Sequence, residues 1–376
     1  MAIIPSLINS SKAGYNTKTS KGLISLHKLN NDYGVNSDEN SFGVTGNALD
    51  NRIDAIQSKN VFLSKGGFGN DYITGSNLGS DIFGDAGNDT IVGGSINDFL
   101  YGGAGDDIAT GKDGNDVING DSGNDLLNGD LATTTDNASG GNDTINGGAG
   151  NDTIDGGGGN DTIIDKSGDS NIRAGFGNDD INTSGASTID AGAGNDVINS
   201  GDKNDSITAG EGNDGIYAWK GDDKIDAGAG NDTIRAGEGA DIITGGLGAD
   251  TFLFSDKDNT LKKFDVITDF NKAEGDIIKI GNVHIELIGN YTAGTKGMPA
   301  IPAKAETFAT ATQPAKAAVA YVPAVPQKPA VNEPASMQAA FDPITHKLLV
   351  NLDSNPGFDL VIELTGITDF SQIALN

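Results

Sequence analysis

A nine-residue phrase recurs along the chain between residues 66 and 250, and it constrains the fold more than any other feature. Its cleanest copy, residues 147–155, reads Gly-Gly-Ala-Gly-Asn-Asp-Thr-Ile-Asp. An Asp stands at position six, or in one unit next to it, in 18 of 21 units, and position eight is mostly Ile or Leu. Asp89 and Asp179 lie ten full periods apart, so both columns stay in phase over many copies. A glycine-rich sequence without a repeating fold would not maintain that phase.

The spacing predicts short strands separated by tight turns. A three-residue segment with Ile in the middle suits a strand whose central side chain points inward and whose neighbours point outward. The six residues before it must turn, and glycine permits the positive φ angles that such turns need. Two units then form one coil, and successive coils stack at the spacing of paired strands. We predict an all-β fold, a right-handed parallel β-roll with 18 residues per coil over residues 43–254.

The chemistry of the turns points to calcium. Ca²⁺ takes six to eight oxygen ligands, and carboxylates and exposed backbone carbonyls supply them. The net charge is −29, with 53 Asp and Glu against 24 Lys and Arg, which favours cations over nucleic acid as partners. The alternative is that Gly-Asn-Asp only marks turns with solvated Asp. We disfavour it because rows of unligated carboxylates would repel one another.

The predicted calcium ligands are the position-six aspartates and the glycines two residues before an Asp. The aspartates are Asp71, Asp81, Asp89, Asp98, Asp107, Asp116, Asp125, Asp143, Asp152, Asp161, Asp179, Asp196, Asp205, Asp214, Asp223, Asp232, Asp241 and Asp250. The glycines are Gly69, Gly87, Gly105, Gly123, Gly141, Gly159, Gly177, Gly194, Gly212, Gly230 and Gly248.

Alternate units should lie on opposite edges of the roll. One edge carries an intact series from Asp71 through Asp125 and Asp143 to Asp250. The other edge then carries the defects: the displaced Asp81, a degenerate turn at residues 129–137 with Thr134 at position six, Ser170, and the short unit at residues 183–190.

The chain outside the repeats divides into four parts. Residues 1–42 are expected to form an N-terminal arm or cap with one candidate strand at residues 23–26, and residues 43–54 look like a worn repeat. Residues 255–292 and 337–376 are predicted as two parts of a C-terminal β cap, with strands at residues 264–270, 276–280, 283–288, 348–352 and 360–364. Residues 293–336 hold seven of the ten prolines, which is typical of an extended insertion or linker.

Residues 43–254 resemble the repeats-in-toxin (RTX), or haemolysin-type, calcium-binding family. Residues 248–290 and 337–376 are similar to the C-terminal domain of serralysin-like proteases, through Asp-x-Ile-x-Asp-Phe at 265–270 and Gly-Asp-x-Ile at 275–278. The resemblance implies multiple bound calcium ions and export by a type I secretion system. That system reads an uncleaved C-terminal signal, expected here at residues 369–376. The N-terminal segment, residues 1–5, is not the start of a standard signal peptide.

No catalytic pattern is found in the sequence. His27, His284 and His346 are not paired in a zinc-protease motif, and the chain has no Cys. No apolar run is long enough to span a membrane. We therefore expect a secreted, non-enzymatic calcium-binding protein with a structural or interaction role at the cell surface or matrix, and with polysaccharide or other copies of itself as candidate partners. The alternatives are a polysaccharide-binding module, in which Tyr217 and Trp219 could stack on sugars, and an enzyme with an unrecognised site on the outer face.

Overall fold

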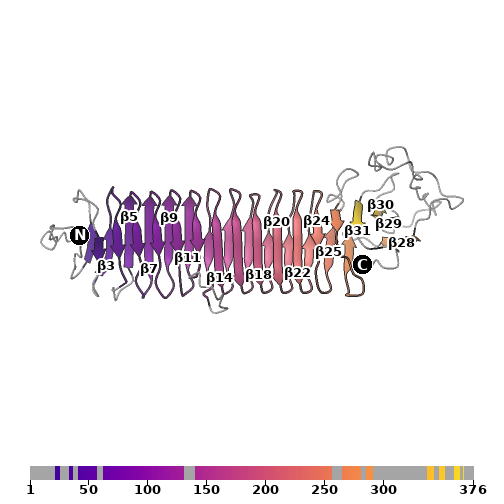
Figure 1. Cartoon of the computed structure of the whole chain (residues 1–376), viewed down its shortest axis with the longest axis horizontal. Coiled ribbons are helices and arrows are strands. Elements are labelled where there is room, and N and C mark those ends of the chain that lie inside the picture. Colours follow the sequence, from indigo (N-terminus) through magenta and orange to yellow (C-terminus); the bar gives the residue numbers. More distant parts are fainter. Residues whose placement is uncertain are drawn as a thin grey trace, which may run out of the picture. The chain divides into compact units, whose positions relative to one another are not determined.

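The structure is a computed structural model that describes residues 22–25, 34–36, 41–56, 62–130, 140–255, 265–280, 285–290, 337–342, 347–351, 360–364 and 367. It divides into two units, residues 1–211 and 212–376. Each regular element in these residues is a β-strand, and many of the strands are labelled in Figure 1.

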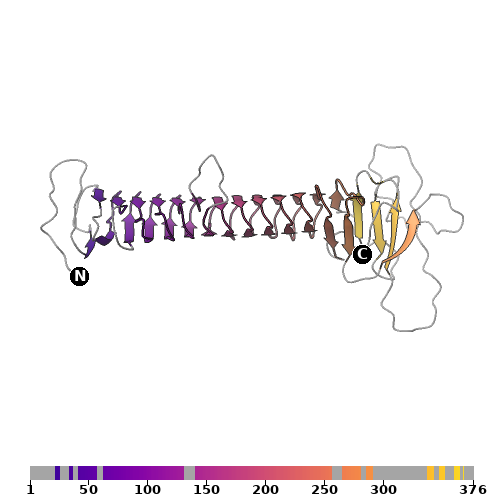
Figure 2. The ribbon, with the colours of Figure 1, turned by 90° about the horizontal axis from the view of Figure 1, so that it is seen from below.

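The first unit stacks its strands alternately into two parallel sheets, seen from a second side in Figure 2. The odd sheet contains β1 (Gly22–Ser25), β3 (Ser41–Thr45), β5 (Phe62–Phe68), β7 (Ser80–Ala86), β9 (Phe99–Ala104), β11 (Val117–Ser122), β13 (Thr144–Asn146), β15 (Thr162–Asp165), β17 (Asp180–Thr183) and β19 (Val197–Asn199). The even sheet contains β2 (Gly34–Asn36), β4 (Arg52–Asp54), β6 (Tyr72–Thr74), β8 (Thr90–Val92), β10 (Ile108–Thr110), β12 (Leu126–Asn128), β14 (Thr153–Gly158), β16 (Asn171–Phe176), β18 (Thr188–Ala193) and β20 (Ser206–Glu211). The parallel β-roll is therefore confirmed.

The second unit continues the same alternation and ends in a mixed sheet. Its odd strands are β21 (Gly215–Tyr217), β23 (Thr233–Arg235), β25 (Thr251–Phe254) and β27 (Ile277–Ile280), and its even strands are β22 (Lys224–Ala229), β24 (Ile242–Thr244) and β26 (Asp265–Ile267). β26 pairs with β31 (Leu360–Leu364), which is antiparallel to β30 (Lys347–Asn351). β30 pairs with β29 (Met337–Asp342), and β29 with β28 (Ile285–Asn290). The sequence did not predict β29, and the Pro-rich segment at residues 293–336 lies outside the described residues.

The core is a ladder of position-eight side chains. Ile145 stands opposite Ile163, and Ile163 opposite Ile181, and all three have no exposed surface. Positions seven and nine point outward, as the alternating burial within these strands requires. In the second unit Phe252 takes the place of the Ile and is also fully buried. Each nine-residue unit thus contributes one large apolar side chain, which leaves the interior thin.

The register of the first unit omits nine residues between β12 and β13. Leu126 pairs with Thr153 and Val117 with Thr144, so matched positions are there separated by 27 residues in place of 18. The prediction that residues 129–137 form one turn of the roll is therefore wrong. The reason is visible in the sequence: position eight of that unit is Asp136, and a carboxylate cannot replace Ile in a dry ladder without a large desolvation cost.

Candidate metal centres

The position-six residues stack into two rows, one at the start of each sheet's strands. The odd row, which leads into odd strands, is Ser80, Asp98, Asp116, Asp143, Asp161, Asp179 and Asp196 in the first unit and Asp214, Asp232, Asp250 and Asp276 in the second. The even row is Asn51, Asp71, Asp89, Asp107, Asp125, Asp152, Ser170, Ser187 and Asp205 in the first unit and Asp223, Asp241 and Asp265 in the second. Every one of these side chains is buried.

The omitted unit changes which aspartates share a row. Asp125 N–H donates to Asp152 Oδ1 at 2.8 Å, and Asp116 N–H donates to Asp143 Oδ1 at 2.7 Å. The predicted edge that continued from Asp125 to Asp143 is therefore wrong. Within the first unit, the odd row is unbroken from Asp98 to Asp196, and the even row is interrupted by two serines. The predicted defects at Ser170 and in the short unit are real, and Thr134 lies outside the described residues.

At most aspartates of the rows, one carboxylate oxygen accepts a hydrogen bond from a backbone N–H of the neighbouring coil. Asp161 N–H donates to Asp179 Oδ1 at 2.7 Å, and Asp179 N–H donates to Asp196 Oδ1 at 2.8 Å. The Oδ2 atoms are buried and accept no hydrogen bond at Asp71, Asp89, Asp107, Asp116, Asp125, Asp143, Asp152, Asp161, Asp179, Asp232 and Asp250. A buried anionic oxygen without a partner is costly, and a cation is the partner that removes the cost.

Backbone carbonyls meet these oxygens beside the position-one residues. A Cβ placed on Gly84 would lie 2.3 Å from Asp89 Oδ2 and 2.5 Å from the Gly102 carbonyl oxygen of the next coil. At Gly156 the same test finds Asp161 Oδ2 at 2.5 Å. The carboxylate and carbonyl oxygens are thus within about 5 Å of each other, a span that one calcium ion can bridge with its bonds of roughly 2.3–2.6 Å. The sequence interpretation missed these position-one carbonyls.

The position-four glycines of the predicted set have a steric role. Gly87 has a φ of 129°, and a Cβ on it would lie 1.9 Å from the carbonyl oxygen of Gly69 in the preceding coil. Gly230 stands in the same relation to Gly212, at 1.6 Å. Only glycine allows such close stacking of turns. Ligation by the carbonyls of these glycines stays a prediction.

Burial makes ionisation of the row carboxylates unfavourable. Desolvation, with a smaller contribution from neighbouring carboxylates, raises the pKa of Asp143 to about 8 and the pKa of Asp116 and of Asp179 to about 7. Among the residues described, no three acidic or histidine side chains gather into a cluster. The reason is architectural, because each coil brings one carboxylate to a row and backbone carbonyls must complete any site.

Asp81 was predicted as a ligand, and this is wrong. Ser80 occupies position six, stands opposite Phe62 and is 2% exposed, whereas Asp81 faces outward on β7 and is half-buried. The nine-residue period assigns position six to Ser80, because the buried side chain of Ile82 lies at position eight, two residues later.

The serine interruption contains a carboxylate at an unexpected place. Asp165 stands at position one of the turn that ends at Ser170, and the Ser170 hydroxyl hydrogen-bonds to its carboxylate. A Cβ on Gly147 would lie 2.5 Å from Asp152 Oδ2 and 3.1 Å from Asp165 Cγ. Asp165 therefore faces the same space as Asp152. At the next even-row turn Ser187 has no such replacement, and its N–H donates to Asp205 Oδ1 at 2.8 Å.

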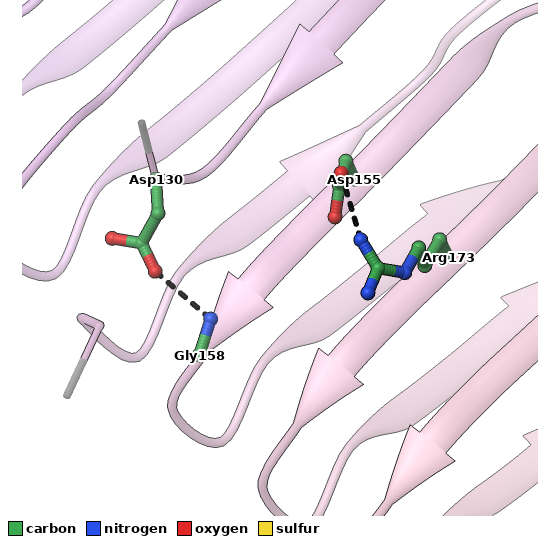
Figure 3. Close-up of polar contacts among 4 residues, drawn as sticks. All are labelled: Asp130, Asp155, Gly158 and Arg173. Carbon is green, nitrogen blue, oxygen red and sulfur yellow. Dashed lines mark hydrogen bonds and ion pairs between the residues drawn. The ribbon is translucent and has the colours of Figure 1, made fainter. Parts of the chain in front are cut away.

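Two further polar contacts lie outside the rows, shown in Figure 3. Asp130 Oδ2 accepts a hydrogen bond from Gly158 N–H at 2.9 Å, which ties the chain down where the register omits nine residues. Arg173 Nη1 lies 3.7 Å from Asp155 Oδ2 on the outer face of the even sheet. Because both side chains are partly exposed to solvent, the pair contributes little to stability.

Comparison with known proteins agrees with the geometry. A family model, the RTX calcium-binding nonapeptide repeat (4 copies), matches residues 83–117, 101–132, 137–163, 155–187, 181–216, 190–225 and 220–252. No curated protein matches the chain. Within the described part of the chain, no helix is long and apolar enough to cross a membrane. RTX repeats bind Ca²⁺, and the many copies here mean that the chain binds several calcium ions.

Proposed function

We propose that this chain, an RTX β-roll protein that binds several calcium ions, is secreted, folds on calcium outside the cell and has a structural or interaction role at the cell surface or matrix. The observation that carries the proposal is the pair of rows of buried Asp side chains whose Oδ2 atoms accept no hydrogen bond. Because these rows extend along the stacked turns, the calcium sites are formed by the fold of the repeats.

Coupling between calcium and folding follows from three properties. The core is thin, the chain carries a net charge of −29, and burial raises the pKa of the row carboxylates. All three oppose the calcium-free fold, because like charges resist compaction and desolvated carboxylates are costly. Extracellular calcium modules bind with dissociation constants of about 10⁻⁴ to 10⁻³ M. Cytosolic calcium would then leave the chain unfolded and competent for export.

Calcium titration tests this coupling. Circular dichroism of the full chain should show much less β-structure in chelator than in calcium and a cooperative gain as calcium is added, with magnesium as the control ion. If β-structure and melting temperature are the same with chelator and with calcium, folding is not coupled to calcium and the proposal fails.

Export by a type I system rests on the resemblance of the repeats, and its signal is proposed at residues 369–376, outside the described residues. Deleting these residues should retain the protein in the cytosol of a secreting host and leave its calcium-dependent fold intact. Continued secretion of the truncated chain would contradict the assignment of the signal.

The proposed role is non-enzymatic, since calcium would occupy the buried row carboxylates. A polysaccharide-binding role is the second candidate, and Trp219 favours it. Trp219 is 49% exposed and has a φ of 70°, at a turn position where most equivalent residues are glycine. A bulky residue in this conformation is strained, and strain of this kind is concentrated at functional sites. The guanidinium of Arg235 lies 5.9 Å from the indole centroid, which places a cation beside a stacking surface and suits an acidic sugar chain.

Binding of oligouronates by calorimetry would separate the two roles. Trp219→Gly should abolish binding, and Leu247→Gly, at another exposed turn of the same unit, should not. Absence of binding by the unsubstituted chain across an array of acidic and neutral glycans would remove this second candidate.

A further inference from the structure

In the first turns of the two rows in the first unit, the position-six side chain accepts a hydrogen bond from the backbone of its own turn. At three turns the backbone N–H of position two donates to the side chain of position six: Asn47 to Asn51 Oδ1 at 2.9 Å, Ser76 to Ser80 Oγ at 2.8 Å, and Gly94 to Asp98 Oδ2. In later turns, such as those ending at Asp143 and Asp161, the Oδ2 atom is instead buried without a hydrogen bond. The beginning of the odd row therefore differs from its continuation.

A lysine ammonium lies at this beginning. Lys112 Nζ donates to the carbonyl oxygen of Gly93, in the preceding coil, at 2.7 Å. Gly93 stands at position one, the place whose carbonyls meet the carboxylates in other turns. The Lys112 charge also acts on Asp98: burial raises the pKa of the Asp98 carboxyl to about 6, and the ammonium opposes that rise. The Lys112 ammonium thus interacts with a turn carbonyl and with a row carboxylate. These are the two kinds of group that would bind calcium at the other turns.

The backbone of Lys112 adopts a conformation that is unfavourable for lysine. Its φ is 87°, in the left-handed region, and the equivalent residues Gly103 and Gly148 have φ angles of 115° and 105°. Glycine adopts this conformation freely and lysine does not. A non-glycine residue persists there only when the surrounding contacts hold it. The bond from Nζ to Gly93 is such a contact.

The neighbouring position-six residue fits the same picture. The row begins with Ser80, whose hydroxyl carries no charge, so a calcium ion between the turns at Ser80 and Asp98 would have one carboxylate where later sites have two neighbouring ones. A monovalent ammonium balances a single carboxylate, whereas a calcium ion there would be held by one carboxylate fewer than at the later sites. We infer that the ammonium of Lys112 occupies the position of a calcium ion at the start of the odd row, so that the coil carrying Gly93 and Asp98 is closed by a cation that the chain itself supplies.

This inference concerns one position and is independent of where the protein acts. If the chain is not secreted, or has no surface role, the Lys112 site is unaffected. It predicts that the turn at residues 93–98 keeps its order when calcium is removed, whereas the turns at Asp161 and Asp179 lose theirs.

Two measurements on the full chain test it, with Lys112→Gly as the variant and Lys166→Gly as the matched control. Lys166 is also at position two of a turn but is exposed. In calcium-loaded crystals, Lys112→Gly should gain an ion beside the Gly93 carbonyl and Asp98, while the unsubstituted chain and Lys166→Gly have none there. In hydrogen exchange with chelator, residues 93–98 should lose protection in Lys112→Gly and in Lys112→Gln, and calcium should restore it in Lys112→Gly.

Three results would overturn the inference. The first is a calcium ion already bound at Gly93 in the unsubstituted chain. The second is exchange at residues 93–98 that Lys112→Gln leaves unchanged in chelator. The third is equal loss of protection in Lys112→Gly and Lys166→Gly.

Discussion

Replacing Asp179 by Asn removes one charge from the odd row and keeps the side-chain shape. Asp179 is 2% exposed, its Oδ1 accepts a hydrogen bond from Asp161 N–H at 2.7 Å, and its Oδ2 accepts none. The amide of Asn can keep the Oδ1 bond, and the first coil already carries Asn51 at the same position. The substitution therefore isolates the charge from the hydrogen bond.

The expected effect has opposite signs with and without calcium. Burial and the neighbouring Asp161 raise the pKa of Asp179 from 3.8 to about 7. A pKa difference of one corresponds to about 1.4 kcal/mol. Ionised Asp179 therefore costs the calcium-free fold up to about 4 kcal/mol at pH above 7, and Asn should recover up to that amount. With calcium, losing an ion present at ten to a hundred times its dissociation constant should cost about 1.4–2.7 kcal/mol.

Urea unfolding followed by circular dichroism in millimolar calcium measures the free energy of the calcium-loaded fold. For the calcium-free chain, the β-structure content in chelator at pH above 7 is compared between the variants. Asp180→Asn is the control, because Asp180 is adjacent and makes the same charge change on the exposed face of β17. Asp179→Asn should stabilise the chelated chain and destabilise the calcium-loaded one, while Asp180→Asn changes neither by much. Equal destabilisation of both states by Asp179→Asn would refute the reasoning.

Three other outcomes are expected. In chelator, β-structure should increase as the pH falls from 8 to 5. Burial raises the pKa of Asp143 to about 8 and that of Asp116 to about 7, so both bind more protons in the folded than in the unfolded chain. A circular dichroism signal that does not change over this range would contradict this expectation. Gly87→Ala should destabilise the roll by about 2–4 kcal/mol in thermal unfolding, because its Cβ would meet the Gly69 carbonyl at 1.9 Å and its φ is 129°; a loss under about 0.5 kcal/mol would show that the turn can rearrange. A calcium-loaded crystal structure should show calcium bound at Asp161 on the odd row and none bound by Ser187 on the even row. Full occupancy at both positions would show that a hydroxyl at position six is sufficient to bind calcium.

The local architecture could be predicted from the sequence because it depends on near neighbours. The period of nine places Ile or Leu in the core and Asp at the entrance of each strand, and glycine permits the turns between them. Ile145, Ile163 and Ile181 stack as their spacing requires. The choice of calcium follows from the same short-range chemistry, since a buried carboxylate and turn carbonyls recur in most of the nine-residue units.

Row membership depends on the whole stack, and only the tertiary structure decided it. Each unit that leaves the stack moves every later Asp to the opposite edge, so the unit with Asp136 at position eight redirects Asp143 and Asp152 although their own repeats are regular. Contacts between coils are equally invisible in the period. Asp165 faces Asp152 and Lys112 reaches Gly93 across the gap between successive coils, at sequence distances that the repeat does not mark. The repeat specifies what each coil contains, and stacking determines which side chains meet.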